Sequence, residues 1–264
     1  MQDPIGRIFS QSGLTFYGGL ILAAAAIAWY GYKKGIKLRH LVDATAPALM
    51  IAYAVGRIGC QVSGDGDWGV YNSAYVSDAN GTVTVAAPGD FEKQLQKNAS
   101  YFTEGKVADT AGTFVYVTDR VYPSIAAVPH ISFKGPGFLP TWLFAYSYPQ
   151  NVNRDGIVMP GVADEHNRVL PQPVFPTPLY EIIICTLLFA FLWAIRKKIK
   201  TPYVLFGIYL TVNGMERFLV ESIRVNKTYS ILGLNPSQAQ IIAIMLIITG
   251  LVTIVLARKN AHRL

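Results

Sequence analysis

The chain has 264 residues, of which 52% are hydrophobic and only 15% are charged. The apolar residues form long blocks that charges rarely interrupt, a composition that is typical of membrane proteins and excludes an ordinary water-soluble domain. The formal net charge of +7 does not indicate nucleic-acid binding, because the basic residues gather in patches beside the apolar blocks and form no stripe interleaved with aromatic side chains.

Five apolar blocks are long enough to cross a hydrocarbon core of roughly 30 Å as helices, which takes about 20 residues. We expect helices and not strands, because a helix satisfies its own backbone in lipid. The blocks are 14–32, 41–60, 178–195, 203–222 and 239–257. Lys33 and Lys34 follow the first block without a small-residue cleavage site, so we interpret that block as a retained span and not as a secretory signal.

The basic patches predict the topology. They follow the first, third and fifth blocks, which places all of them on one side of a membrane if the spans alternate. By the positive-inside rule that side is cytoplasmic, and the N-terminus, segment 61–175 and loop 223–238 are outside. The patches are Lys33, Lys34, Lys37 and Arg39; Arg196, Lys197, Lys198 and Lys200; and Arg258, Lys259 and Arg263.

The outer segment 61–175 differs in composition from the rest of the chain. It is rich in Gly, Pro, Asn, Asp and Tyr, with β-branched runs at 81–86 and 113–118 and a helical pattern at 91–101. We therefore expect a mixed or irregular domain inserted into an all-α, polytopic membrane protein. Residues 1–60 would carry two helices and residues 176–264 three, giving a bundle of about five transmembrane helices.

Ionisable residues inside membrane spans are costly and mark functional sites. Most of those in this chain lie toward the outer ends of their spans, whereas Asp43 lies at the cytoplasmic end and is interpreted as a helix-start residue. The set is Asp43, Arg57, Glu181, Glu216, Arg217 and Glu221.

In the fourth block, polar residues recur at helical spacing and predict a polar stripe on one face: Asn213, Arg217, Glu221 and Arg224. A structural ion pair between Arg217 and Glu221 is an equally good reading of the spacing. In the second block, Arg57 lies between Gly56 and Gly59, which lets a lipid headgroup approach. Two arginines from different spans could clamp a phosphate, and single snorkelling arginines are the alternative.

The sequence implies no cofactor and no metal. It contains no zinc-ligand spacing, phosphate-binding loop or nucleophile elbow. The turn from Gly64 to Asp67 has alternating carboxylates that suit Ca²⁺, but the other ligands of a known calcium loop are absent, so we interpret it as a turn with one functional carboxylate. Cys60 and Cys185 lie in different spans, where a disulfide is not expected.

Five motifs in the same order resemble those of the prolipoprotein diacylglyceryl transferase family. The signature G-R-x-G-N-F-x-N-x-E-x-x-G of that family is similar to the run from Gly56 to Gly69. The other matches are Thr15-Phe-Tyr-Gly-Gly-Leu20, Phe175-Pro-Thr-Pro-Leu-Tyr-Glu181, Arg217-Phe-Leu-Val-Glu-Ser-Ile-Arg224 and Pro236-Ser-Gln-Ala-Gln240. Together they cover essentially every expected span.

The resemblance implies an enzyme of the bacterial inner membrane that moves a diacylglyceryl group from phosphatidylglycerol to the lipobox cysteine thiol in the signal peptide of a pre-lipoprotein. Its active site and segment 61–175 would face the periplasm. We expect a monomer that is surrounded by membrane lipids and binds no nucleic acid. The implied catalytic residues are Arg57, Arg217, Tyr17 and Glu221. The implied substrate-binding residues are Arg57, Arg217, Arg224, Asp65, Tyr180, Glu181, Gln240, Gly18 and Gly19.

In the implied mechanism, Arg57 and Arg217 hold the lipid phosphate while Asp65 and Glu221 orient them by ion pairing. The chain departs from the family pattern where Tyr17 and Phe175 replace histidines, so Tyr17 becomes the positional candidate for the proton acceptor. The chain also begins without the spans that usually precede the first motif, which suggests a truncated sequence. A catalytically inactive lipid- or lipoprotein-binding relative is the alternative function, and a small transporter is a weaker one.

Overall fold

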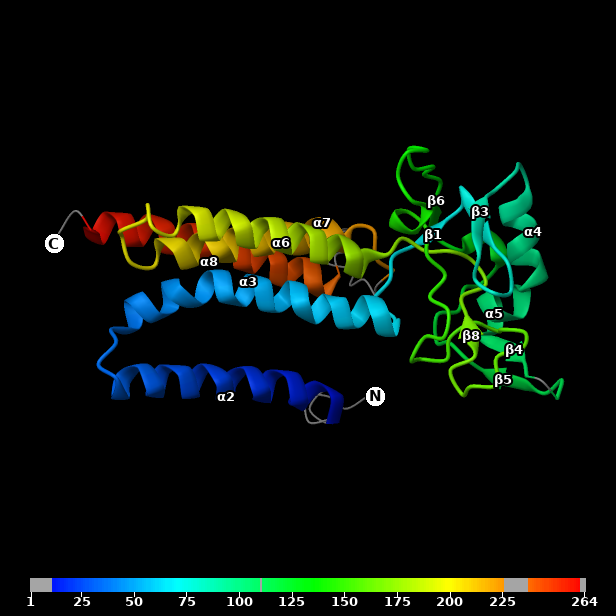
Figure 1. Ribbon diagram of the computed structural model, residues 1–264, viewed down its shortest axis with the longest axis horizontal. Coiled ribbons are helices and arrows are strands. Elements are labelled where there is room, and N and C mark those ends of the chain that lie inside the picture. The colour runs from blue at the N-terminus through cyan, green and yellow to red at the C-terminus, as the bar shows by residue number, and fades with distance from the viewer. Residues whose placement is uncertain (1–10, 110, 226–236, 262–264) are drawn as a thin grey trace.

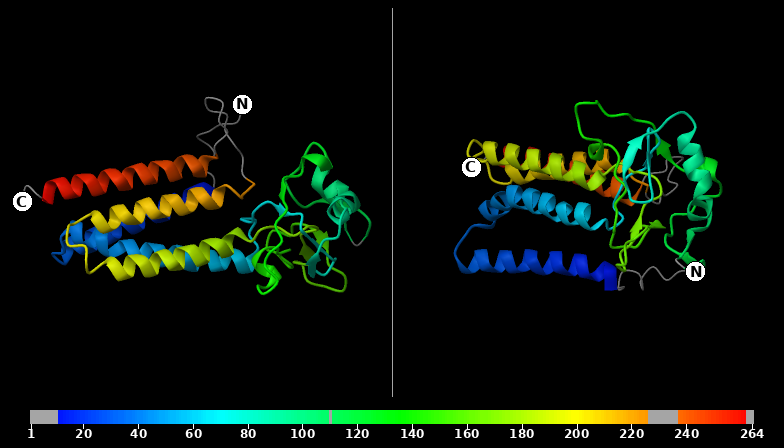
Figure 2. Two further views of the ribbon diagram at one scale, coloured as in Figure 1. Left: turned by 90° about the horizontal axis from the view of Figure 1, so that it is seen from above. Right: turned by 45° about the vertical axis from the view of Figure 1, so that its right-hand side comes forward.

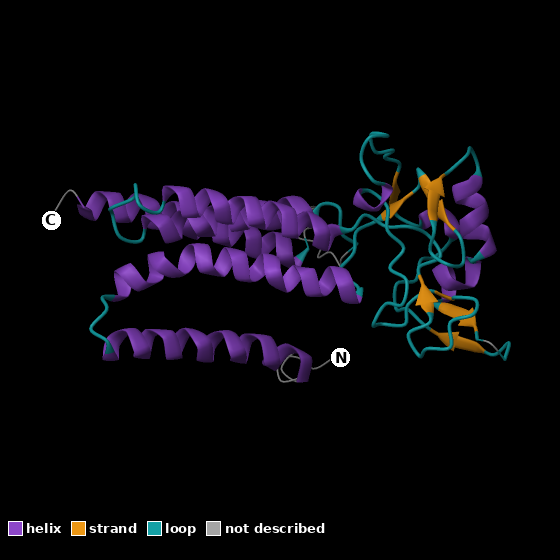
Figure 3. Cartoon of the chain, viewed as in Figure 1, coloured by secondary structure: helices purple, strands orange, loops and turns teal. Residues whose placement is uncertain are grey.

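The computed structural model describes residues 11–109, 111–225 and 237–261. Five long helices lie side by side as a bundle, and a mixed unit of short helices and strands caps one end of it (Figures 1 and 3). The bundle helices are α2 (Gln11–Lys33), α3 (Leu38–Ser63), α6 (Thr177–Ile195), α7 (Val204–Glu221) and α8 (Gln238–Ala261). Each of the five expected apolar blocks lies on one of these helices.

Three helices in the described part of the chain are long and apolar enough to span a membrane: Leu38–Ser63, Thr177–Ile195 and Gln238–Asn260. Helix α7 is also long, but it carries Glu216, Arg217 and Glu221. The expectation of a mostly helical membrane protein is confirmed. The count of five spans remains a prediction.

The ends of α2, α6 and α8 that carry the basic patches lie together at one end of the bundle, opposite the mixed unit (Figure 1). This is the arrangement that the charge pattern requires, with Arg263 lying outside the described residues. At the same end, the Asp43 carboxylate accepts hydrogen bonds from the backbone N–H groups of Tyr203, at 2.7 Å, and Phe206, at 2.9 Å. Asp43 therefore caps the neighbouring helix α7 and does not start its own.

Helices α7 and α8 pack closely through small residues. A Cβ atom added to Gly207 would lie 2.9 Å from the Gly250 carbonyl oxygen, and one added to Gly214 would lie 2.7 Å from the Ala243 carbonyl oxygen. Small residues at such crossings let two helix backbones approach closely. Close packing of this kind holds helices together in a bilayer, where the hydrophobic effect does not favour helix association. On the other side of the bundle, α3 and α6 meet around a core that includes Met50, Cys185 and Leu192.

The mixed unit is built from short elements, as the composition of 61–175 indicates. In the described residues its strands pair only in twos: β1 with β6 in parallel, and β2 with β3, β4 with β5 and β7 with β8 antiparallel. The elements are β1 (Tyr71–Asn72), β2 (Tyr75–Ser77), β3 (Val83–Val85), α4 (Asp90–Lys97), α5 (Ala99–Glu104), β4 (Lys106–Ala108), β5 (Phe114–Tyr116), η1 (Ile125–Ala127), β6 (His130–Ile131), η2 (Thr141–Leu143), β7 (Ile157–Val158) and β8 (Arg168–Val169).

The single helix expected at 91–101 is wrong, because the segment forms two helices that break at Asn98. The Asn98 backbone lies outside the helical region at φ −112° and ψ 32°, and its side-chain amide donates to the Gln94 carbonyl oxygen at 2.9 Å. An Asn side chain that binds the preceding turn in this way offers the backbone an alternative to a continuous helix. The two short helices place Phe91, Leu95 and Phe102 in the core of the unit.

Backbone hydrogen bonds join the two ends of the mixed unit to each other and to the end of α7. The Gly69 N–H donates to the Phe175 carbonyl at 2.8 Å, and the Val70 N–H donates to the Ile223 carbonyl at 2.9 Å. Gly69 has no room for a side chain, because a Cβ atom would lie 2.8 Å from the Ile223 carbonyl oxygen. The segments that enter and leave the mixed unit therefore run together at the end of the bundle, as Figure 2 shows.

We expect Gly207→Val to destabilise the bundle by about 1 to 3 kcal/mol, because the new side chain would push against the backbone of α8. Thermal unfolding in detergent would measure the effect. Gly59→Ala is the control, since nothing lies within 4 Å of a Cβ atom at that helical position. Equal stability of the two variants would contradict the close packing of α7 on α8.

Candidate functional site

Two arginines and two carboxylates meet where the bundle joins the mixed unit. Arg57 on α3 forms ion pairs with Asp67, and with Glu181 on α6 through Nε and Oε2 at 2.9 Å. Arg224, which follows α7, reaches the same carboxylates, with its Nη2 3.2 Å from Asp67 Oδ2 and 3.6 Å from Glu181 Oε2. We call these four residues the ion-pair cluster.

Glu181 is the buried centre of the cluster, since only 2% of its side chain is exposed, against 44% for Asp67. Its second oxygen, Oε1, accepts a hydrogen bond from the Tyr53 hydroxyl at 2.7 Å. The Tyr53 ring also lies under the Arg57 guanidinium, with 5.2 Å between the guanidinium carbon and the ring centroid. A charge this deeply buried is tolerated only when it is paired and hydrogen-bonded, and both conditions are met here.

Local structure explains how these side chains meet. Tyr53 and Arg57 are one helical turn apart and so share a face of α3. Helix α3 ends at Gly64 in the left-handed region, at φ 63°, and the chain turns back so that the Asp67 carboxylate faces Arg57. The Asp67 carbonyl accepts hydrogen bonds from Thr177 Oγ1 at 2.6 Å and from Arg224 Nη2 at 3.0 Å, which fixes the turn against α6.

The electrostatics of Asp67 follow from its neighbours. Partial burial acts to raise the pKa of its carboxyl group, but the guanidinium groups of Arg224 and Arg57 outweigh burial and hold that pKa below its ordinary value. Asp67 therefore stays ionised and keeps both arginines in place at neutral pH.

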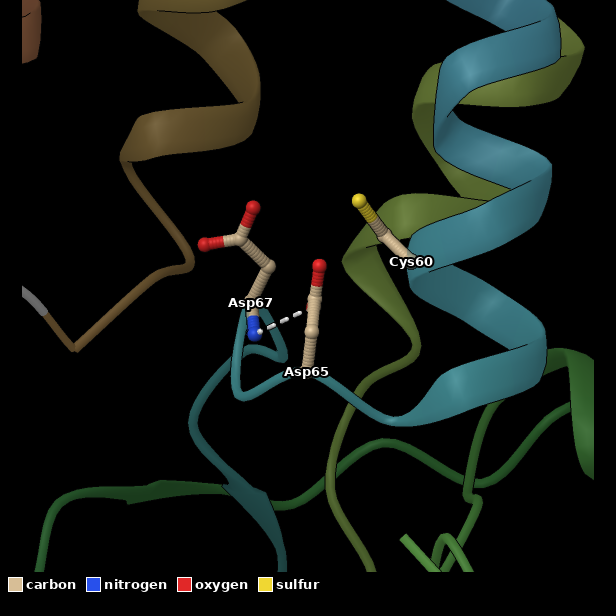
Figure 4. Close-up of side chains that lie close together, drawn as sticks. All are labelled: Cys60, Asp65 and Asp67. Atoms are coloured by element: carbon tan, nitrogen blue, oxygen red, sulfur yellow. Dashed lines mark hydrogen bonds between the residues drawn. The ribbon is translucent and has the colours of Figure 1, made fainter. Parts of the chain in front are cut away.

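The expected ion-pairing role of Asp65 is wrong, because Asp67 occupies that position. Asp65 is exposed, and its Oδ1 accepts a hydrogen bond from the Asp67 backbone N–H at 3.3 Å (Figure 4). The side-chain ligand atoms of Cys60, Asp65 and Asp67 lie within 4.8 Å of one another, a spacing that could hold a metal ion. Arg57 already faces this group, with its Nη1 3.5 Å from Cys60 Sγ and in contact with Asp67, and a cation there would meet its positive charge.

Arg57 shares its two carboxylate partners with Arg224, whereas the resemblance implied that Arg217 acts beside Arg57. A phosphate-binding role of Arg217 stays a prediction. Helix α7 ends at Glu221, so Arg224 lies beyond the helix and is not part of the predicted polar stripe. The Arg224 backbone instead forms an isolated β-bridge with Gly69. Arg217 is half-buried, and its Nε atom has no hydrogen-bond partner among the described residues. The Arg217–Glu221 ion pair stays a prediction. Glu221 is buried and accepts a hydrogen bond from the Ser237 hydroxyl at 2.5 Å.

Gln240 and Tyr180 make structural contacts. The Gln240 side-chain oxygen accepts a hydrogen bond from the Ser237 N–H at 2.9 Å, while Ser237 Oγ accepts one from the Gln240 N–H at 3.2 Å. This reciprocal pattern is a capping box at the start of α8. The Tyr180 hydroxyl donates to the Leu143 carbonyl of the mixed unit at 2.7 Å.

The first motif lies in α2. Gly19 is exposed, whereas the exposure of Tyr17 and Gly18 lies outside what the structure describes. The expectations for these three residues stay predictions.

Two further residues at this end of the bundle, Tyr53 and Glu216, had no expected role. Tyr53 could have been found from its spacing of four residues to Arg57. Glu216 is only 2% exposed, and neither of its carboxylate oxygens has a hydrogen-bond partner among the described residues. It interacts electrostatically with Glu181 and Arg217, so it belongs to the charged interior at this end of the bundle.

Comparison with known proteins gives a family match over almost the whole chain. A family model described as prolipoprotein diacylglyceryl transferase matches residues 3–256. The chain is similar to proteins named phosphatidylglycerol–prolipoprotein diacylglyceryl transferase from several bacteria. It is 43% identical to one from Leptospira interrogans over 63 residues, which cover 24% of this chain and 20% of that protein.

Two longer matches carry the same name. The chain is 23% identical to the protein from Xylella fastidiosa over 95% of its own length and 65% of that relative. It is 24% identical to the protein from Chlorobaculum tepidum over 99% of its own length and 66% of that relative. The chain thus spans less than two thirds of the length of these relatives.

We expect Glu181→Gln to lower the free energy of unfolding by about 3 to 5 kcal/mol, because it leaves two arginines facing a buried neutral amide. Asp67→Asn is the matched comparison and should cost less, since the Asp67 side chain is 44% exposed. Thermal unfolding of both variants in detergent tests the order. A larger loss from Asp67→Asn would show that Glu181 is not the centre of the cluster.

The lowered pKa of Asp67 also predicts a dependence on pH. A carboxyl group whose pKa is depressed by folding adds stability above its unfolded pKa of about 3.9, and this stability is lost as pH falls through the lower folded value. The loss of stability on acidification should therefore be shallower in Asp67→Asn than in the unaltered protein. Parallel stability curves below about pH 4 would rule out this contribution.

Proposed function

The chain belongs to the prolipoprotein diacylglyceryl transferase family, and from this premise we propose that it transfers a diacylglyceryl group from phosphatidylglycerol to the lipobox cysteine thiol of a pre-lipoprotein. Its relatives are named for these two substrates, phosphatidylglycerol and prolipoprotein. The main structural support for this proposal is the ion-pair cluster, because it brings two arginines together at one end of a bundle of apolar helices.

The proposed role of the cluster is to bind the lipid phosphate between Arg57 and Arg224. Each guanidinium group offers a planar fork of donors that matches phosphate oxygens. Of the two carboxylates that hold these arginines, Asp67 is the exposed one, so the phosphate approaches from the side of Asp67. Glu181 and Tyr53 stay in place behind Arg57 and keep it oriented when Asp67 is displaced. Arg217 is half-buried on the same helix as Glu221 and supplies further positive charge.

The proposed reaction forms a bond from the cysteine sulfur to the glyceryl carbon and breaks the bond from that carbon to the phosphate oxygen. Glycerol phosphate leaves with the bonding electrons, and the arginines neutralise the charge that develops on it. The thiol must lose its proton, because the thiolate is the nucleophile. Tyr17 remains the positional candidate to receive this proton, although a phenol has an ordinary pKa of about 10 and needs a lowered value to act as a base at neutral pH.

We further propose that the protein lies in the bacterial inner membrane with five spans, with the mixed unit and the ion-pair cluster on the periplasmic side. The common location of the basic patches at the opposite end of the bundle supports this orientation. The substrate then enters from the outer leaflet, at the level of the cluster.

We expect cells depleted of their own transferase to recover lipid modification of a model pre-lipoprotein when they express this chain, measured by the mass shift of the product. Arg57→Ala and Arg224→Ala should each lower the rate by about a hundredfold or more, because each removes a donor aimed at developing charge. Arg154→Ala is the control, since its ion pair with Glu165 is exposed and lies in the mixed unit.

Lipid binding without a mass shift would contradict the transferase and favour a lipid-binding relative. A mass shift that survives in Arg57→Ala and Arg224→Ala would place the phosphate elsewhere. Expression of all variants in the membrane at equal amounts must be shown, because loss of one arginine leaves the buried Glu181 with a single ion-pair partner and lowers the stability of the bundle.

A further inference from the structure

The mixed unit presents one cluster of exposed large apolar side chains on a single loop, residues 133–144. Phe138 is 85% exposed, Trp142 is 51% exposed and Phe133 is 47% exposed, and Leu139 adds a fourth apolar side chain. Several exposed large apolar side chains on one short loop are uncommon on a surface that faces water and mark a place of interaction. The proposed transfer reaction does not use this loop.

The shape of the 133–144 loop is fixed from inside the unit. The fully buried Asn72 donates through its side-chain amide to the carbonyl oxygens of Phe133, at 2.9 Å, and Phe144, at 3.0 Å, and so holds the two ends of the loop together. The Gly135 N–H donates to the Tyr75 hydroxyl at 2.9 Å, and Gly135 lies so close to the Phe144 ring that no side chain would fit there. The exposed aromatic residues therefore stand on a rigid base.

The loop is tied to the bundle at the depth where a spanning helix begins. The Tyr180 hydroxyl donates to the Leu143 carbonyl at 2.7 Å. Tyr180 is the fourth residue of α6, so its Cα atom lies roughly 5 Å along the helix from its start, and its side chain reaches back toward that start. At the same end of the bundle, Val62 of α3 and Leu219 of α7 are 82% and 64% exposed, so the apolar surface of the bundle extends to this level.

The pictures agree with this placement. The loop beside β6 lies on the side of the mixed unit that faces the bundle, in each of the views of Figures 1 and 2. It also projects past the side of the bundle and not over its axis. The β4–β5 hairpin lies farther from the bundle end.

The charges around the loop match a lipid surface. Between Asp119 and Asp155 the sequence contains no acidic residue, although segment 61–175 as a whole has more acidic than basic residues. The one charged residue in the loop itself is Lys134. Lys134 lines a surface pocket that Glu92 of α4 also lines, so this carboxylate is an acidic group that the structure places near it. Aromatic rings with a cation on the same loop suit the headgroup region of a bilayer, where rings bury an apolar body and anionic lipids attract basic groups.

We infer that the 133–144 loop inserts into the interfacial region of the bilayer at the end of the bundle that carries the mixed unit, with Phe138 and Trp142 as its anchors. The loop then fixes the mixed unit against the membrane, so that the unit is held by its chain connections on one side and by lipid on the other. The partner is the lipid surface itself, and neither a second copy of the chain nor a peptide is required.

A fluorescent probe tests this inference in the full-length protein. A cysteine at position 138, introduced as Phe138→Cys in a chain with Cys60→Ser and Cys185→Ala, would carry an environment-sensitive dye. The protein would be placed in nanodiscs of phosphatidylcholine and phosphatidylglycerol whose acyl chains carry a nitroxide near the headgroup. The matched control is Phe114→Cys on β5, which replaces another exposed aromatic residue, 63% exposed, on the β4–β5 hairpin. Thermal unfolding shows that both labelled proteins are folded.

We expect the nitroxide lipids to quench the dye at position 138 severalfold more than the dye at position 114. Equal quenching at the two positions, or none at 138, would overturn the inference. An emission shift at 138 that grows with the number of proteins in each disc, without quenching by lipid, would overturn it in favour of contact between two copies of the chain. None of these results depends on transferase activity, so the inference and the proposed function can fail separately.

Discussion

A single buried carboxylate constrains the whole end of the bundle. Glu181, at the start of α6, is almost fully enclosed, and its charge is tolerated because Arg57, Arg224 and Tyr53 converge on it. These partners come from α3 and from the segment after α7, so satisfying one charge fixes three elements relative to one another. Asp67 completes the set from the turn after α3 and thereby attaches the mixed unit to the same point.

This constraint explains how a largely apolar bundle keeps a polar site at its end. The arginines are held by carboxylates of unequal exposure, and in the proposed function the more exposed one, Asp67, is the partner that the lipid phosphate displaces. Backbone hydrogen bonds at Gly69 and Val70 attach the mixed unit closely to the end of α7, beside the cluster. In the inference above, the 133–144 loop sets the height of that unit relative to the bilayer.

The sequence predicted the five long helices and three of the four members of the cluster, because apolar blocks and intramembrane charges are strong signals. The sequence predicted Asp65 beside Arg57, whereas Asp67 lies there. The left-handed turn at Gly64 decides which of the two carboxylates faces Arg57, and helical periodicity does not extend into this turn. The sequence also predicted that the helical stripe of the fourth block extends to Arg224, although α7 ends at Glu221 and Arg224 lies beyond the helix, beside Arg57. The break at Asn98 likewise depends on a local side-chain contact that competes with the helix.

The most direct test of the phosphate site is a double-mutant cycle on lipid binding. The affinity for phosphatidylglycerol would be measured in the unaltered protein, in Arg57→Ala, in Arg224→Ala and in the double variant, with diacylglycerol as the ligand that lacks phosphate. If the two arginines share one phosphate, the second substitution should cost far less than the first for phosphatidylglycerol, and neither should affect diacylglycerol. Additive losses, or equal losses for the two lipids, would contradict a shared phosphate site at the ion-pair cluster.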